Sequence, residues 1–144
     1  MHPNDTLRKF KYPDTLLKEY EHWVILLRPN QPTIGSLILA SKGDAESMAE
    51  LSIIAFHELS AAVKDIEYGL KKAFQYDKIN YMALMMVDKQ VHFHVIPRYA
   101  EDRSFEDIVF TDKGWPTLPN LTETIELNDE EFDILYKYLQ KHFS

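Results

Sequence analysis

The sequence predicts an α+β domain, in which helices pack on one face of an antiparallel sheet. Two pairs of apolar runs predict the sheet, because each pair flanks a turn as the strands of a β-hairpin do: residues 23–27 with 34–40, and residues 78–87 with 90–96. The main helix is predicted by apolar residues that recur every three or four positions between residues 44 and 74.

The first hairpin is expected to follow a loosely held N-terminal arm, residues 1–13. A short helix is expected at residues 15–20, with Asp14 as its N-cap. The strand at residues 23–27 is a continuous apolar run rich in strand formers, and the turn at residues 28–32 contains two prolines.

The long helix is expected to begin at Asp44, whose side chain suits an N-cap, and to run to about Phe74. Gly69 is its weakest position, because glycine is a poor helix former. The expected apolar stripe consists of Met48, Leu51, Ala55, Leu59, Ala62, Ile66, Leu70 and Ala73.

The second hairpin is predicted as a strand over residues 78–87, a two-residue turn at Asp88 and Lys89, and a returning strand over residues 90–96. Pro97 lacks a ladder donor, so we expect the strand to end there or to lie at an edge of the sheet.

The C-terminal third is predicted to be mostly irregular. Residues 99–110 carry several charges and are expected to form a loop or a weak edge strand, and residues 114–120 are irregular by composition. Asn128 is expected to cap a final helix. The apolar face of that helix would consist of Phe132, Leu135, Tyr138 and Leu139.

The returning strand of the second hairpin carries the chemistry. Polar and apolar residues alternate strictly from Gln90 to Val95, so Gln90, His92 and His94 share one face and the apolar residues share the other. Neighbours on one face lie roughly 6.5–7 Å apart, so one phosphate can touch the central residue and both flanking ones. Arg98 follows at the end of this stretch.

Such a histidine pair suits three kinds of site. A neutral imidazole can attack phosphorus and form a covalent intermediate, if a second group holds its tautomer and a third stabilises charge on the phosphoryl oxygens. Two imidazoles can also bind zinc, copper or iron, and His22, His57 and Asp88 are candidate further ligands that the sequence does not place. The third kind of site binds a ligand without turnover.

Composition sets further limits. With 144 residues, of which 45% are hydrophobic, one globular domain over residues 1–144 is expected, with its core in residues 20–100 and a C-terminal loop and helix in residues 101–144. The sequence has no cysteine, which excludes a disulfide scaffold and a thiolate zinc site.

Charge and hydropathy exclude two kinds of partner. The formal net charge of −7 argues against binding to a nucleic-acid backbone, which favours a basic face. No apolar run reaches the ~18 residues of a membrane span, and the polar N-terminus does not resemble a signal peptide. We therefore expect a cytoplasmic protein that binds neither nucleic acid nor membranes.

Residues 90–98, Gln-Val-His-Phe-His-Val-Ile-Pro-Arg, resemble the signature of the histidine-triad (HIT) family. That signature reads His-φ-His-φ-His-φ-φ, with φ apolar, and is commonly followed by Pro-Arg. Residues 23–29 and 35–39 resemble the first hairpin of the family, including the glycine that opens its second strand. The resemblance covers roughly residues 20–100 and implies a HIT-like fold.

The resemblance implies a role for each signature residue. The middle histidine of the family attacks the α-phosphorus of a nucleotide, and its counterpart here is His92. The third histidine contacts the transferred phosphoryl group, and its counterpart is His94. The first histidine supports the site, but Gln90 takes its place here. Glutamine forms hydrogen bonds but cannot carry a proton at neutral pH, so we expect an altered but active site.

Four further residues are predicted to bind substrate. Lys89 would supply a cation to phosphate, or would be an ordinary solvated turn residue. Ser36 lies next to the turn from which the family can contact the same site. Arg28 occupies a position where many members have a ribose-binding polar residue. Trp115 resembles the tryptophan of a Trp-Pro segment that some members place near the partner subunit's site, or it is a hydrophobic anchor of its loop.

The resemblance implies a nucleotide hydrolase or transferase that needs no cofactor or obligatory metal. Its substrates would be nucleoside phosphoramidates or dinucleoside polyphosphates, and it would act as a homodimer whose two sheets join edge to edge. Two alternatives remain at this stage. One is a nucleotide-binding protein whose catalysis is weak or lost because of Gln90, and the other is a metal-dependent enzyme.

Overall fold

The main sheet has five strands, and all neighbouring strands run antiparallel in the order β1-β2-β4-β6-β5. The computed structural model describes residues 2–143. Both predicted hairpins are present, since β2 pairs with β4 and β5 pairs with β6, and the α+β class is confirmed. The strands are β1 Leu16–Glu19, β2 Trp23–Leu27, β4 Leu37–Ser41, β5 Lys78–Met82 and β6 His92–Arg98.

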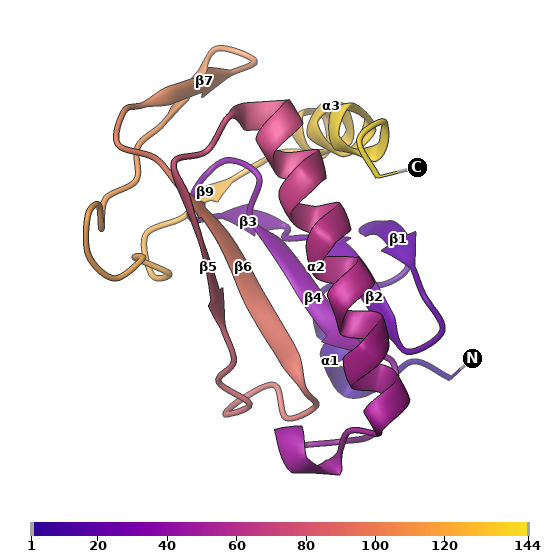
Figure 1. Cartoon of the computed structure of the whole chain (residues 1–144). Coiled ribbons are helices and arrows are strands. Elements are labelled where there is room, and N and C mark those ends of the chain that lie inside the picture. Colours follow the sequence, from indigo (N-terminus) through magenta and orange to yellow (C-terminus); the bar gives the residue numbers. More distant parts are fainter. Residues whose placement is uncertain (1, 144) are drawn as a thin grey trace.

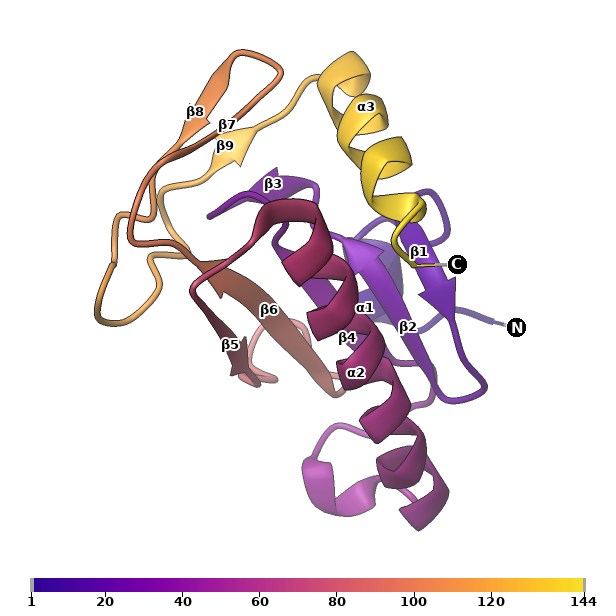
Figure 2. The ribbon, with the colours of Figure 1, turned by 45° about the horizontal axis from the view of Figure 1, so that its top comes forward.

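Helices cover both faces of this sheet, and not one face as predicted. The helices α2 (Ile53–Phe74) and α3 (Asp129–Gln140) pack on one face, and α1 (Asp5–Lys9) packs on the other. Figure 1 shows α2 in front of the sheet and α1 behind it, and Figure 2 shows α3 near β1. Within residues 2–143, no helix is long and apolar enough to cross a membrane.

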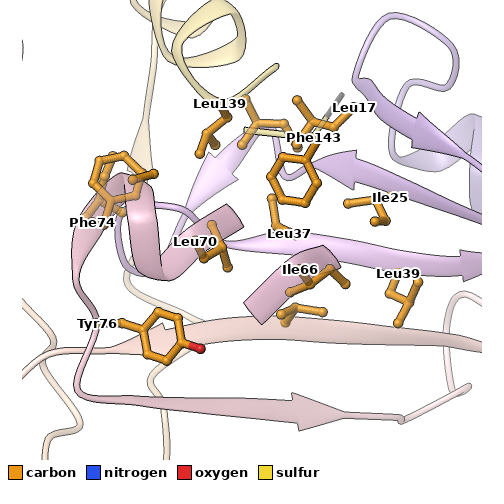
Figure 3. Packing of buried hydrophobic residues seen from close by; sticks show 14 of the residues in the cluster. Leu17, Ile25, Leu37, Leu39, Ile66, Leu70, Phe74, Tyr76, Leu139 and Phe143 are labelled. Carbon is orange, nitrogen blue, oxygen red and sulfur yellow. The ribbon is translucent and has the colours of Figure 1, made fainter. Parts of the chain in front are cut away.

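The main core lies between the sheet, α2 and α3, as Figure 3 shows for the cluster around Leu37, Ile66 and Leu139. The predicted stripe of α2 is confirmed from Ala55 onward, and its buried members are Ala55, Ala62, Ile66, Leu70 and Ala73. Met48 and Leu51, which were predicted to belong to it, precede the helix. Gly69 is more than a weak helical position. A Cβ there would lie 2.9 Å from the carbonyl oxygen of His142 and 3.2 Å from the ring of Phe143, so glycine admits the C-terminal segment.

The helix α2 begins at Ile53, nine residues after the predicted start at Asp44. Ser52 is the N-cap, and its hydroxyl accepts a hydrogen bond from the backbone N–H of Ala55 at 3.0 Å. The preceding segment contains only a short 3-10 helix, Met48–Glu50. The carbonyl of Ala45 accepts the N–H of Val91 at 2.9 Å, and this long-range bond ties residue 45 to the loop before β6.

The N-terminal segment also differs from the prediction. Residues 2–13 are not the loose arm predicted for residues 1–13, because α1 forms there with Asn4 as its N-cap, and Leu7 and Phe10 are buried against the second face of the sheet. Met1 lies outside the described residues. Residues 16–19 form β1 and not a helix capped by Asp14, because they pair with β2 at the edge of the sheet. The sequence of this stretch fits either conformation, and strand pairing decides between them.

The second hairpin has a longer connection than predicted. The strand β5 ends at Met82, and residues 83–91 connect it to β6, in place of a two-residue turn at Asp88 and Lys89. The strand β6 continues through Pro97 to Arg98 and is not an edge strand. Pairing of β6 with β4 ends at Leu37 and Val95, so the N–H that Pro97 lacks is not needed for a bond to β4. The Pro97 carbonyl accepts a hydrogen bond from the hydroxyl of Thr33.

The remaining elements are short. Within residues 99–110, predicted as a loop or a weak edge strand, residues 103–110 form a small separate hairpin, which Figure 2 shows outside the main sheet. Asn128 caps α3 as predicted, with a capping box to Glu131. Gly35 adopts a φ of +90° before β4, which a side chain rarely allows. The short strands are β3 Asn30–Gln31 with β9 Ile125–Glu126, and β7 Arg103–Phe105 with β8 Ile108–Phe110.

Candidate active site

The two histidines of β6 lie together on the face of the sheet that α1 covers. The centroids of the His92 and His94 rings are 5.2 Å apart, in an edge-to-face arrangement. Val91 and Val95 point to the main core, so the predicted alternation of faces is confirmed. Both histidines are buried, with 2% of His92 and 8% of His94 exposed.

The orientation of the His92 ring is determined by a backbone group. Its Nδ1 lies 2.8 Å from the carbonyl oxygen of Gln90. A carbonyl oxygen only accepts hydrogen bonds, so Nδ1 carries the proton and donates it. In the neutral ring this assignment leaves Nε2 with a free lone pair, which is the state that a nucleophilic imidazole requires.

The side chain of Gln90 is bound to α1. Its Oε1 accepts hydrogen bonds from the backbone N–H of Thr6 at 3.1 Å and from the Thr6 hydroxyl at 2.8 Å. The backbone N–H of Gln90 donates in turn to the Thr6 hydroxyl at 3.2 Å. Gln90 thus connects the N-terminal segment to the strand of the histidines.

The N-terminal segment also covers the two imidazoles. The ring centroid of Phe10 lies 5.9 Å from that of His92 and 6.1 Å from that of His94. An ion pair between Lys9 and Asp88 at 3.5 Å joins the end of α1 to the loop before β6. Sequence reasoning missed these contacts, although the Asn4 cap followed by buried Leu7 and Phe10 was a usable signal of a packed helix.

Replacing Phe10 by alanine is expected to expose both imidazoles, because this ring contacts each of them. Diethyl pyrocarbonate should then modify His92 and His94 severalfold faster than in the wild type, as measured by peptide mass spectrometry. Phe56→Ala is the matched control, since Phe56 is 42% exposed on α2. Equal modification rates in Phe10→Ala and the wild type would contradict the proposed cover.

His94 is neutral at physiological pH. Its burial, the charge of Arg28 and then that of His92 lower its pKa to about 4, and Asp88 opposes the shift. Its Nδ1 is buried and has no hydrogen-bond partner within residues 2–143. A neutral ring with a free nitrogen can donate to or accept from a ligand that enters the site.

The low pKa of His94 predicts a loss of stability in acid. The unfolded chain protonates this histidine near its ordinary pKa of about 6.5, whereas the folded protein does so only near 4. The free energy of unfolding should therefore fall by about 1–2 kcal/mol from pH 7 to pH 5 on account of this residue. Urea titrations of the wild type and His94→Asn test this, and identical pH slopes in the two proteins would contradict it.

Arg28 lies just beyond β2 on the same face as His94. Its backbone N–H donates to the carbonyl of Ser36 at 3.2 Å, so Arg28 continues the pairing of β2 with β4. Leu26, Ile38 and His94 form a row across the sheet. Arg28 follows Leu26 by two positions, and side chains two positions apart in a strand point to the same face. The residue is only 8% exposed, and burial lowers the pKa of its guanidinium.

Known protein structures share this fold. A histidine triad (HIT) protein from Sinorhizobium meliloti matches with a TM-score of 0.75 and 21% identity, over 98% of this chain and 96% of that one. A histidine triad protein from Bradyrhizobium japonicum gives a TM-score of 0.71 at 17% identity, over 99% and 98% of the two chains. One from Marinobacter aquaeolei gives 0.70 at 20% identity, over 99% and 95%.

The chain has the histidine-triad (HIT) fold. The solved structures extend the likeness to almost the whole chain, beyond the residues 20–100 that the sequence resemblance covers. Comparison of the sequence with models of protein families finds no match, and comparison with curated proteins finds none.

In this HIT fold the other predicted site residues lie in different environments. Lys89 is exposed on the loop before β6. Ser36 is fully buried, and its hydroxyl donates to the Thr33 carbonyl at 2.9 Å, so we assign it to the turn before β4 and not to the substrate site. Trp115 is half-buried in the irregular segment whose residues 117–119 lie beside β5. Arg98 is paired with Asp112 and does not join the histidines.

The metal-site alternative is not supported at the histidine pair. Within residues 2–143, the one group of three potential metal ligands is Glu21, His22 and Glu58, whose ligand atoms lie within 4.8 Å of one another. Neither His92 nor His94 belongs to it, and Glu58 already accepts the backbone N–H of His22 at 2.6 Å.

Proposed function

We propose that this chain is a HIT-family nucleotide hydrolase or transferase in which His92 attacks the α-phosphorus of a nucleotide. The observation that carries the proposal is the bond between His92 Nδ1 and the Gln90 carbonyl, because it directs the lone pair to Nε2. Substrates are nucleoside phosphoramidates or dinucleoside polyphosphates, and the chemistry requires no metal.

The proposed reaction has two steps. In the first, a P–N bond forms between His92 Nε2 and phosphorus, and the bond from phosphorus to the leaving group breaks. In the second, water or another acceptor attacks phosphorus, the P–N bond breaks and the nucleotide leaves. Neutral His94 contacts a phosphoryl oxygen, and the exposed ammonium of Lys89 is a further proposed phosphate contact.

Gln90 has a different part in this proposal from the first histidine of a triad. Its carbonyl orients His92, while its side-chain oxygen binds Thr6. His92 is 2% exposed, so α1 and Phe10 must shift before a nucleotide reaches it. Such a shift breaks the bonds of Gln90 with Thr6 and those of Asn4 with the carbonyls of Ser41 and Gly43.

The test is a turnover assay with adenosine 5′-phosphoramidate and diadenosine tetraphosphate, each with and without a chelator. We expect AMP as a product in both conditions. Quenching under alkaline conditions should trap adenylate on residue 92, detected by peptide mass spectrometry. Turnover that depends on a metal, or an adduct on another residue, would contradict the mechanism.

A protein that binds nucleotides without turnover is the second candidate. It is favoured by the burial of His92 beneath Phe10 and by the engagement of Gln90 with Thr6. Calorimetry separates the two candidates, because binding of AMP with no hydrolysis of either substrate supports the second one.

We also propose that the protein is a homodimer joined along β5. This strand is the last in the sheet, and Leu118 beside it is 79% exposed. An edge-to-edge dimer would pair β5 with its copy and bring the Trp115 segment toward the partner subunit's site. Light scattering should give twice the chain mass of 16.9 kDa, and a monomer at micromolar concentration would contradict this proposal.

A further inference from the structure

Two buried side-chain nitrogens lack a hydrogen-bond partner within residues 2–143, and both belong to the candidate active site. They are Nε of Arg28 and Nδ1 of His94. Arg28 is 92% buried, since only 8% of it is exposed, and no carboxylate in the described chain forms an ion pair with it. Among the described residues, the one polar contact of its guanidinium is from Nη1 to the Asn30 carbonyl, at 3.5 Å.

An arginine in this state is unusual, because a buried charge without a partner is strongly unfavourable. The same protein shows what a structural arginine requires. Arg98 is also buried, and it binds both oxygens of Asp112, at 2.7 and 3.0 Å, as well as the side chain of Asn80. The guanidinium of Arg28 lacks such partners, so its donors remain available to an anion from outside the chain.

We propose that Arg28 binds a second anionic group of the substrate, distinct from the phosphoryl group that His92 attacks. This inference rests on the proposed function, and it specifies the substrate as a nucleotide with at least two anionic groups. The ligand chemistry is phosphate, whose oxygens match the planar fork of arginine. The phosphate belongs either to a polyphosphate leaving group or to the sugar.

The position of Arg28 indicates that it contacts a second anionic group of the substrate and not the phosphoryl group that His92 attacks. His92 and His94 occupy β6, and Arg28 lies beyond the end of β2, with β4 between the two strands. Arg28 is nevertheless on the same face as His94, two positions along from the row of that histidine, so one extended substrate can reach both.

The experiment compares the wild type, Arg28→Gln and Arg28→Lys on three substrates. Adenosine 5′-phosphoramidate has one phosphate, diadenosine tetraphosphate adds phosphates on the leaving group, and the phosphoramidate of 3′-phosphoadenosine adds one on the sugar. Arg28→Gln should raise KM about 10- to 100-fold for a substrate with the second phosphate, and less than threefold for the first, with kcat little changed. Arg28→Lys should recover only part of the loss, because lysine lacks the fork.

The substrate affected identifies the source of the phosphate. A rise in KM with diadenosine tetraphosphate alone assigns it to the leaving group, and a rise with the 3′-phosphate alone assigns it to the sugar. Equal losses on all three substrates would overturn the proposal, because Arg28 would then serve the attacked phosphate. Unchanged kinetics on all three would overturn it as well. Lys137→Gln is the control, because Lys137 is an exposed cation on α3, which packs on the opposite face of the sheet, and its loss should change none of these values.

A binding measurement separates this inference from the proposed function. If no substrate is turned over, the proposed function fails, but calorimetry with AMP, ADP and adenosine 3′,5′-bisphosphate still tests Arg28. The inference is supported if the wild type binds ADP or adenosine 3′,5′-bisphosphate more tightly than AMP and Arg28→Gln loses this preference. Equal affinities of the wild type for all three ligands overturn it. Arg28→Gln should melt at or above the wild-type temperature without ligand, and a marked drop would make Arg28 a structural residue.

Discussion

Replacing His92 by alanine is expected to lower kcat by about 10⁴-fold or more with either proposed substrate, because it removes the atom that forms the bond to phosphorus. His94 does not substitute for it, because no group within residues 2–143 bonds its Nδ1 and holds its tautomer as the Gln90 carbonyl does for His92. The measurement is steady-state release of AMP from adenosine 5′-phosphoramidate.

Two controls accompany this variant. His92→Ala should still bind AMP within about tenfold of the wild-type affinity, which shows that the site is folded. His22→Ala removes a histidine of the β1–β2 connection, on a different element from the proposed site, and should leave kcat unchanged. Turnover in His92→Ala within tenfold of the wild type would exclude His92 as the nucleophile.

Replacing Arg98 by alanine is expected to lower the free energy of unfolding by about 3–5 kcal/mol. Asp112 is only 1% exposed in its side chain, and it would become a buried charge without its counter-ion. Arg98 also donates to the Asn80 side chain and to the Thr117 carbonyl, at 2.7 and 2.8 Å. The substitution should therefore loosen the segment that contains Trp115. Chemical denaturation measures the loss.

The surface pair of Lys137 and Asp133 provides the control for this prediction. Their side chains are 71% and 56% exposed, so Lys137→Ala should change stability by less than about 0.5 kcal/mol. The double variant Arg98→Met with Asp112→Leu should recover much of the loss, because it removes both charges together. A loss below 1 kcal/mol in Arg98→Ala would show that the pair is not structural.

Local patterns in the sequence were sufficient for the main elements. The alternation from Gln90 to Val95 placed His92 and His94 on one face, because successive side chains of a strand point in opposite directions whatever the rest of the chain does. The stripe of α2 and the Asn128 cap of α3 are local features of the same kind.

Errors arose where a contact from a distant residue decided the local conformation. Residues 16–19 form a strand because they pair with β2. Residues 44–52 do not belong to α2, because the Ala45 carbonyl accepts the N–H of Val91 instead of an N–H of the helix. The connection at residues 83–91 was underestimated, since its apolar residues Met86 and Val87 look like strand but are 77% and 84% exposed.

The sequence by itself determined the histidine-bearing strand, the two hairpins and the α+β class, because these follow from side-chain periodicity and turn chemistry over a few residues. Only the tertiary structure decided what surrounds the histidines. The bond from Gln90 to Thr6 joins residues 84 positions apart, and Arg28 is recognisable as an unpartnered cation only once every neighbour is in place. Burial and charge pairing are properties of the whole packed chain, so no local pattern contains them.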